Sequence, residues 1–170
     1  ISGKPSWASF STSTGHLSGT PKNGDAGSYS NIRITVSDGN NGSDVLGPFS
    51  ITVSNTNDAP ILSGTPPTSV AEDSAYSFQP SASDPDGDTL SYSISSKPSW
   101  ASFSTSTGRL SGAPGNGDAG SYSDIRITVS DGNNGSDSIG PFSITVSNTN
   151  DAPILSGTPP ASATEDSAYS

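Results

Sequence analysis

Short stretches in which apolar and polar residues alternate recur along the chain, and this pattern predicts β-strands. In the stretch 121–129, Ile125, Ile127 and Val129 fall on one face of the predicted strand. Pro or Gly interrupts almost every stretch that could form a helix, so an all-β fold is expected. Further strands are predicted at 75–79, 90–94, 140–147, 101–103 and 108–111.

Three aromatic positions refine this picture. Tyr122 is out of phase with the hydrophobic residues that follow it, which predicts either a β-bulge or a tyrosine hydroxyl that bonds back across a corner. Trp100 and Phe103 are expected to anchor the core, because a single tryptophan in a small sandwich domain is usually buried.

The whole pattern repeats with a period of 93 residues, since residues 1–77 recur as residues 94–170. A repeat of about a hundred residues with about seven short strands is typical of an immunoglobulin-like Greek-key sandwich. We therefore predict tandem Ig-like repeats, with one complete repeat at 59–151 between partial repeats at 1–58 and 152–170. Because the chain starts and stops within a repeat, we expect it to be an excerpt of a longer protein.

The composition limits the classes of function. Sixteen acidic and six basic residues leave a net charge of −10, which disfavours binding to nucleic acid. No apolar run is long enough to span a membrane. The chain has no cysteine, so metal ions between acidic groups are the expected source of extra stability. Few lysines and many small hydroxylated residues fit a secreted or surface-exposed bacterial protein.

Acidic residues concentrate in loops and at the repeat junctions rather than along the strands. The loop Asp84-Pro85-Asp86-Gly87-Asp88 spaces three carboxylates one residue apart on a tight turn, and calcium prefers such oxygen ligands. Asp-Pro-Asp-Gly is also ordinary turn chemistry, and the loop alone does not decide between the two interpretations. The Asn/Asp-rich linkers at 55–58 and 148–151, together with an early Glu, favour calcium.

This combination resembles the cadherin family, in which calcium is held between successive domains. The chain is also similar to the bacterial dystroglycan-type cadherin-like (putative Ig) domains, through Pro98–Phe103, Thr107–Gly112, Asp118–Tyr122 and Val129–Gly132. The linker is one Asn shorter than in animal cadherins, so one or two ions are expected at each junction rather than three.

The resemblance implies two sets of calcium ligands. The junction at Asp58 would use Asp25, Asn55, Asn57, Asp58, Asp84, Asp86, Asp88 and Asp131. The junction at Asp151 would use Glu72, Asp118, Asn148, Asn150 and Asp151.

The leading hypothesis is a non-catalytic, calcium-stiffened stalk or adhesive repeat, located outside the cell or on its surface. Its partners would be the neighbouring repeats of the same chain and, in a fibre, other copies of the protein. The alternative is a carbohydrate-binding module, or an accessory array of a polysaccharide-degrading enzyme. The only histidine, His16, is Arg109 in the other repeat, so we expect it to be a surface residue and expect no catalytic triad.

Overall fold

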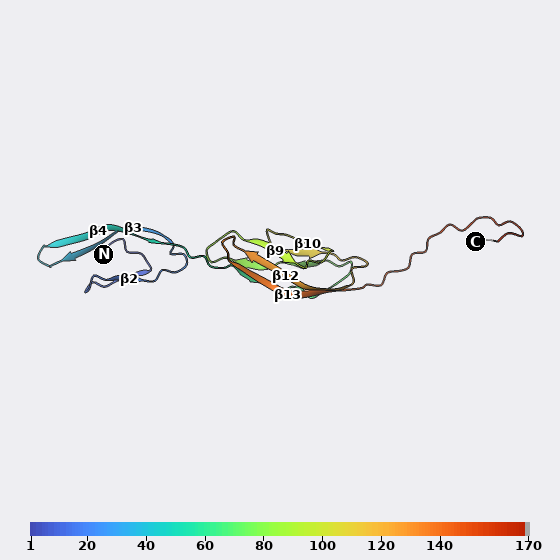
Figure 1. Ribbon diagram of the computed structural model, residues 1–170, viewed down its shortest axis with the longest axis horizontal. Coiled ribbons are helices and arrows are strands. Elements are labelled where there is room, and N and C mark those ends of the chain that lie inside the picture. Colours follow the sequence, from blue (N-terminus) through green and yellow to red (C-terminus); the bar gives the residue numbers. More distant parts are fainter. Residues whose placement is uncertain (169–170) are drawn as a thin grey trace.

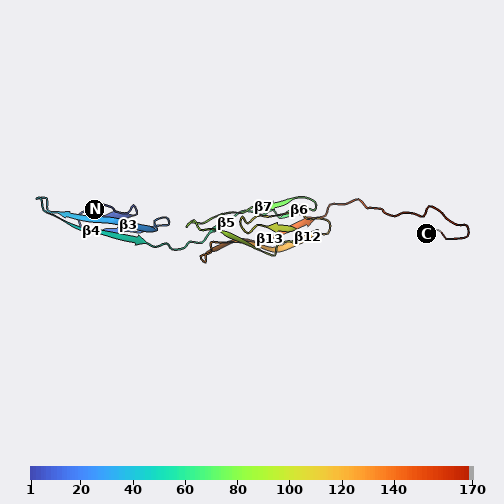
Figure 2. The ribbon, with the colours of Figure 1, turned by 90° about the horizontal axis from the view of Figure 1, so that it is seen from above.

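The computed structural model describes residues 1–168, and within them every regular element is a β-strand. Two β-rich bodies lie one after the other, and the C-terminal segment extends away from the second (Figures 1 and 2). The first body contains β1 (Ala8–Phe10), β2 (Leu17–Gly19), β3 (Gly27–Ser37) and β4 (Ser43–Val53). The second contains β5 (Ile61–Ser63), β6 (Ser69–Ala71), β7 (Tyr76–Phe78), β8 (Ser81–Ser83), β9 (Ser91–Ser95), β10 (Ala101–Phe103), β11 (Leu110–Gly112), β12 (Gly120–Ser130) and β13 (Ser136–Ser147).

The second body is a sandwich of two main sheets. One sheet has the order β6-β13-β12-β9, in which β6 is parallel to β13 and the other pairs are antiparallel. The other has the order β10-β11-β7, and β5 pairs with β8. The predicted all-β, Ig-like fold is confirmed.

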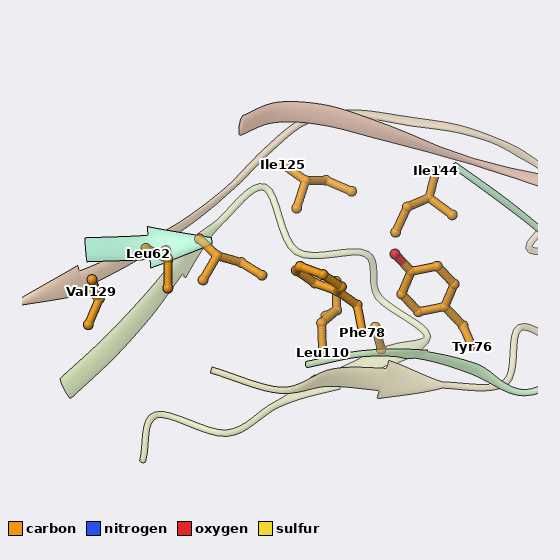
Figure 3. Close-up of a cluster of buried hydrophobic side chains, with 9 residues drawn as sticks. Leu62, Tyr76, Phe78, Leu110, Ile125, Val129 and Ile144 are labelled. Carbon is orange, nitrogen blue, oxygen red and sulfur yellow. The ribbon is translucent and has the colours of Figure 1, made fainter. Parts of the chain in front are cut away.

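The predicted alternation places the core correctly. Ile125, Ile127 and Val129 on β12 are fully buried, as is Ile144 on β13. They pack with Leu110 and with further buried side chains from both sheets (Figure 3). Burial of each large aliphatic side chain contributes about 1.5–3 kcal/mol, so this cluster is the main source of stability in the second repeat.

Both features predicted for Tyr122 are present. The pairing of β12 with β13 shifts register on either side of Ile125, which is the expected irregularity. The Tyr122 hydroxyl also donates a 2.9 Å hydrogen bond to the backbone carbonyl of Asp118. Tyr29 makes the same bond, at 2.8 Å, to the carbonyl of Asp25. The tyrosine therefore ties the start of the long strand to the loop before it in both repeats.

Trp100 is half-buried at the edge of the core, and Phe103 packs against the same cluster. The indole makes edge-to-face contacts with Tyr76 and Tyr122, with ring centroids 5.7 and 5.9 Å apart. Its buried Nε1 has no hydrogen-bond partner. The predicted role of Trp100 as a core anchor is thus confirmed, through ring packing alone.

The short strands β5, β6 and β8 were not predicted. Each spans three residues in a segment rich in Pro, Gly and Ser, so none shows enough alternation to be recognised. Pairing with β13 or with each other forms them instead. Among the described residues, no helix is long and apolar enough to cross a membrane.

The first body presents β3 without the neighbour that β12 has in β9. Ser2 makes one bridge to Arg33, matching the pair Ser95–Arg126 in the second repeat, and beyond it the described residues add no strand. Val36 is consequently 66% exposed, whereas its counterpart Val129 is fully buried.

Burial raises the pKa of Tyr76 to about 12, and its hydroxyl donates to the carbonyl of Pro67. Because the pKa in the folded state lies above the ordinary value of 10.0, the unfolded chain loses this proton first as the pH rises. We expect the contribution of Tyr76 to stability to be complete below pH 10 and to vanish by about pH 12. Urea unfolding midpoints should fall across this window, and the fall should be smaller in Tyr76→Phe. An equal fall in both proteins would contradict the assignment.

Candidate metal site at the junction of two repeats

The acidic loop after β8 folds so that its carboxylates converge. The side chains of Asp84, Asp86 and Asp88 each offer an oxygen, and these oxygens lie within 4.8 Å of one another. Asp84 Oδ1 accepts hydrogen bonds from the backbone N–H of Asp86 at 2.9 Å and of Asp88 at 3.1 Å. Gly87 takes the positive φ of 79° that the turn requires. The loop sequence itself therefore determines this convergence.

The second carboxylate oxygen of Asp84 is the exceptional atom of the loop. Asp84 Oδ2 is buried and has no hydrogen-bond partner. A buried carboxylate oxygen without a donor is costly, because it has lost its water and gained nothing in exchange. A cation beside it would remove that cost.

The linker between the repeats contacts this loop directly. The backbone N–H of Asp58 donates a 2.7 Å hydrogen bond to Asp86 Oδ2. Asn57 Nδ2 donates a 2.8 Å bond to Asp131 Oδ2, across 74 residues of sequence. The structure thus brings Asn57, Asp58, Asp86 and Asp131 together at one junction.

Asp131 is a buried acid, with 5% of its surface exposed. The side chain of Asn57 and the backbone N–H groups of Asn133 and Gly135 all donate to it, and these bonds hold its pKa below the ordinary value. Its two oxygens are therefore engaged by N–H donors. In this arrangement Asp131 secures the linker and its own turn.

The other side chains predicted for this junction are not part of the three-carboxylate cluster. Asp58 Oδ2 accepts a 2.6 Å hydrogen bond from Asn23, which links the linker to the first repeat. Asp25 caps its own loop by accepting from the backbone N–H of Lys22 at 2.8 Å, and it is outside the three-carboxylate cluster. Asn55 is exposed.

At the other end of the second repeat, Glu72 is buried, with 3% of its surface exposed. Its Oε1 accepts a 2.7 Å bond from the backbone N–H of Thr149, while its buried Oε2 has no partner. Glu72, which the resemblance assigned to this junction, therefore contacts the second linker.

The other residues predicted for this second junction make local contacts. Asp118 Oδ2 accepts from the backbone N–H of Gly115 at 2.9 Å, and Asp151 Oδ2 accepts from Asn116 at 2.6 Å. Asn150 donates to the carbonyl of Asp151, and Asn148 is exposed. Asn116 and Asp151 reproduce the contact between Asn23 and Asp58 at the first junction.

Sequence reasoning missed two residues that shape the first junction. Asn133 Nδ2 donates a 2.9 Å bond to Asp88 Oδ2 and so joins the acidic loop to the turn of Asp131. Asp137 Oδ2 accepts from the backbone N–H of Leu62 at 2.8 Å and holds the segment after the linker. Both lie in the stretch 131–137, which is equally rich in Asn and Asp in the two repeats. This Asn- and Asp-rich composition was the sequence feature that indicated a role at the junction.

The donor set fits a hard divalent cation. Three carboxylates within 4.8 Å, one with a buried unpartnered oxygen, offer the oxygen ligands that calcium prefers. Zinc in contrast favours sulfur and nitrogen ligands, and the chain has no cysteine.

Comparison with known proteins identifies the family. The sequence profile of the family described as "Putative Ig domain" matches residues 2–54 and again residues 59–147. The chain belongs to this family. Its two matches correspond to the two β-rich bodies. No curated protein matches the chain.

Among solved structures, the chain is similar to a variant of the endo-fucoidan hydrolase MfFcnA4 of glycoside hydrolase family 107. The identity is 28%, the TM-score is 0.43, and the match covers 85% of this chain and 22% of the hydrolase. A second enzyme of that family, MfFcnA9, gives 24% identity and a TM-score of 0.36 over 84% of this chain and 26% of its own. The chain thus spans about a quarter or less of the length of these hydrolases.

Proposed function

We propose that this Ig-family chain is a non-catalytic, cadherin-like structural or adhesive repeat that calcium stiffens at the junction between repeats. The observation that carries the proposal is the buried, unpartnered Oδ2 of Asp84, in a cluster of three carboxylates hydrogen-bonded to the linker through Asp58. The proposed repeat boundaries are the linkers that end at Asp58 and Asp151.

The physical argument concerns repulsion. Three carboxylates held this close repel one another, and the repulsion is strongest where water is excluded. Calcium, when bound, would supply the compensating positive charge and shared oxygen ligation. Asp84, Asp86 and Asp88 would hold it. The Asp58 N–H donates a hydrogen bond to Asp86, so an ion that orders the loop would also order the linker.

Stiffening explains why repetition would be useful. Identical sandwiches joined by rigid junctions form a rod whose length grows with each repeat, while flexible junctions give a compact chain. A rod of this kind holds a binding or anchoring region away from a surface. This role, outside a bacterial cell or on its surface, is the one we propose for the chain.

Two further features support a non-catalytic role. His16 is exposed, and its backbone carbonyl closes the turn at Ser11. The carboxylates gather in a polar turn whose oxygens accept backbone N–H bonds and hold the linker, which is a structural use of these groups. A carbohydrate-binding role would require exposed aromatic side chains, and no aromatic is among the exposed large hydrophobic residues of the described chain.

The proposal predicts calcium-dependent stability. Calorimetric titration of the 170-residue chain should show calcium binding, and the melting temperature should be higher with calcium than with excess chelator. Asp86→Ala should abolish most of the binding, since it removes both a ligand and the anchor of the linker. Asp124→Asn is the matched control, because Asp124 is exposed and Asn31 occupies its place in the first repeat. Identical melting curves with calcium and with chelator would contradict the proposal.

A further inference from the structure

Four Asn-Gly pairs lie in loops of the two repeats, beginning at Asn23, Asn41, Asn116 and Asn134. An asparagine before a glycine can lose its amide group without an enzyme, because the glycine has no Cβ to hinder attack by its backbone nitrogen. The next residue is glycine in all four pairs, so the sequence alone does not distinguish them. The structure separates them into two classes.

In the first class, a carboxylate holds the N–H of the glycine. The Gly42 N–H donates a 2.9 Å hydrogen bond to Asp38 Oδ1, and the Gly135 N–H donates one of the same length to Asp131 Oδ1. The same carboxylates lie where a Cβ of each glycine would stand. A nitrogen bonded in this way must break its hydrogen bond to a negative group before it can lose its proton and attack. Asn41 and Asn134 are therefore protected.

In the second class, the N–H of the glycine is free. Within residues 1–168, the backbone N–H groups of Gly24 and Gly117 make no hydrogen bond. Apart from their chain neighbours, no described group lies within 4 Å of the place that a Cβ would take on either glycine. Asn23 and Asn116 are themselves exposed, so water reaches both the side-chain amide and the glycine nitrogen.

This exposure is the same in two different surroundings. Asn116 belongs to the repeat in which both sheets of the sandwich are present, whereas the linker after Asn23 leads into a further folded repeat. Each asparagine and the glycine after it are exposed in both settings. In both places one backbone hydrogen bond closes the turn, at 2.9 and 3.0 Å. The exposure is therefore a property of the turn itself.

The same two asparagines hold the linkers that follow their repeats. Asn23 Nδ2 donates a 2.6 Å hydrogen bond to Asp58 Oδ2, and Asn116 Nδ2 donates one of equal length to Asp151 Oδ2. Loss of the amide would replace the donor by a carboxylate and set two negative charges opposite each other. The contact between the repeat and its linker would then be broken.

We propose that Asn23 and Asn116 are sites of spontaneous deamidation, and that their conversion releases each repeat from the linker after it. At Asn23, the backbone nitrogen of Gly24 attacks the side-chain carbon Cγ. The new N–Cγ bond closes a succinimide ring while the Cγ–Nδ2 bond breaks, and the amide leaves as ammonia with the proton of the glycine nitrogen. Water then opens the ring at either carbonyl and leaves aspartate or isoaspartate.

Peptide mapping by mass spectrometry tests the choice of site. The 170-residue chain is incubated at mildly alkaline pH in excess chelator, and the mass gain of deamidation is followed at each asparagine. Asn23 and Asn116 should convert at least about tenfold faster than Asn41 and Asn134, which must first lose a hydrogen bond to a charged group. In urea, where the fold is lost, the four rates should become similar. Equal rates in the folded chain, or the same ranking in urea, would overturn the proposal.

The variant Asn23→Asp tests the consequence for the linker, because it carries the carboxylate of the product. Amide hydrogen exchange of residues 54–58, measured in excess chelator, should be about threefold faster or more than in the wild type. Asn31→Asp is the matched control with unchanged exchange, since Asn31 is exposed and Asp124 occupies its place in the second repeat. Equal exchange in Asn23→Asp and the wild type would contradict the release of the linker. The chelator keeps both measurements independent of the proposed calcium site.

Discussion

Asp84→Asn is expected to lower the calcium affinity of the chain by at least about tenfold, while leaving the fold intact without calcium. An asparagine Oδ1 can still accept the two backbone N–H bonds that Asp86 and Asp88 donate, so the turn should persist. The atom in place of the buried Oδ2 becomes an amide nitrogen, which carries no negative charge and cannot ligate calcium. Calorimetric titration measures the affinity, and thermal melting in chelator measures the fold.

Two control measurements test whether the loss of calcium affinity in Asp84→Asn arises at the acidic loop. Asp124→Asn makes the same chemical change at an exposed position and should leave calcium binding unaltered. In chelator, Asp84→Asn should melt at or above the temperature of the wild type, because one of three repelling charges is gone. Unchanged calcium affinity in Asp84→Asn would exclude the loop as the binding site, even if calcium bound elsewhere.

Val129→Asp is expected to unfold the second repeat, whereas the equivalent Val36→Asp in the first repeat should be tolerated. Val129 is fully buried, and an uncompensated charge there costs about 3–5 kcal/mol. That cost is comparable to the whole stability of a small domain, roughly 5–15 kcal/mol. Val36 is 66% exposed, so its replacement should change stability by about 0.5 kcal/mol or less.

Thermal melting followed by circular dichroism distinguishes the two variants. The melting transition should fall by about 15 °C or more in Val129→Asp, or be lost, and stay close to the wild type in Val36→Asp. The same residue is changed at matching positions, in the complete second repeat and in the first body, where β3 lacks the neighbour that β12 has in β9. Similar losses in both variants would contradict the difference in burial between Val36 and Val129.

Much of the local structure follows from the sequence alone. The alternation of Ile125, Ile127 and Val129 with polar residues predicted the buried face of β12, because successive side chains on a strand point to opposite sides. The acidic loop is equally local, since Asp84 caps the N–H groups of its own turn. A break in the same alternation predicted either a bulge or a tyrosine hydroxyl that bonds back, and the Tyr122 hydroxyl donates to the carbonyl of Asp118.

The contacts at the junction could not be predicted from local sequence patterns, because they join residues far apart in the chain. The bond from Asn57 to Asp131 joins residues 74 positions apart, and that from Asp58 to Asp86 joins residues 28 apart. Which of the many Asp and Asn residues meet is set by the pairing of whole strands. The resemblance to cadherins placed Asp25 in the ligand set of the acidic loop, while in the structure it accepts a hydrogen bond from the backbone N–H of Lys22 in its own turn.

The sequence by itself determined the β-strand alternation, the 93-residue repeat and the tight acidic turn, because each depends on residues close together in the chain. Only the tertiary structure decided that Asp84 has a buried oxygen without a partner, and that Val36 and Val129 differ completely in burial. Val36 and Val129 differ because β9 pairs with β12, whereas the described residues supply only the Ser2–Arg33 bridge beside β3. Such pairing depends on where distant segments of chain lie.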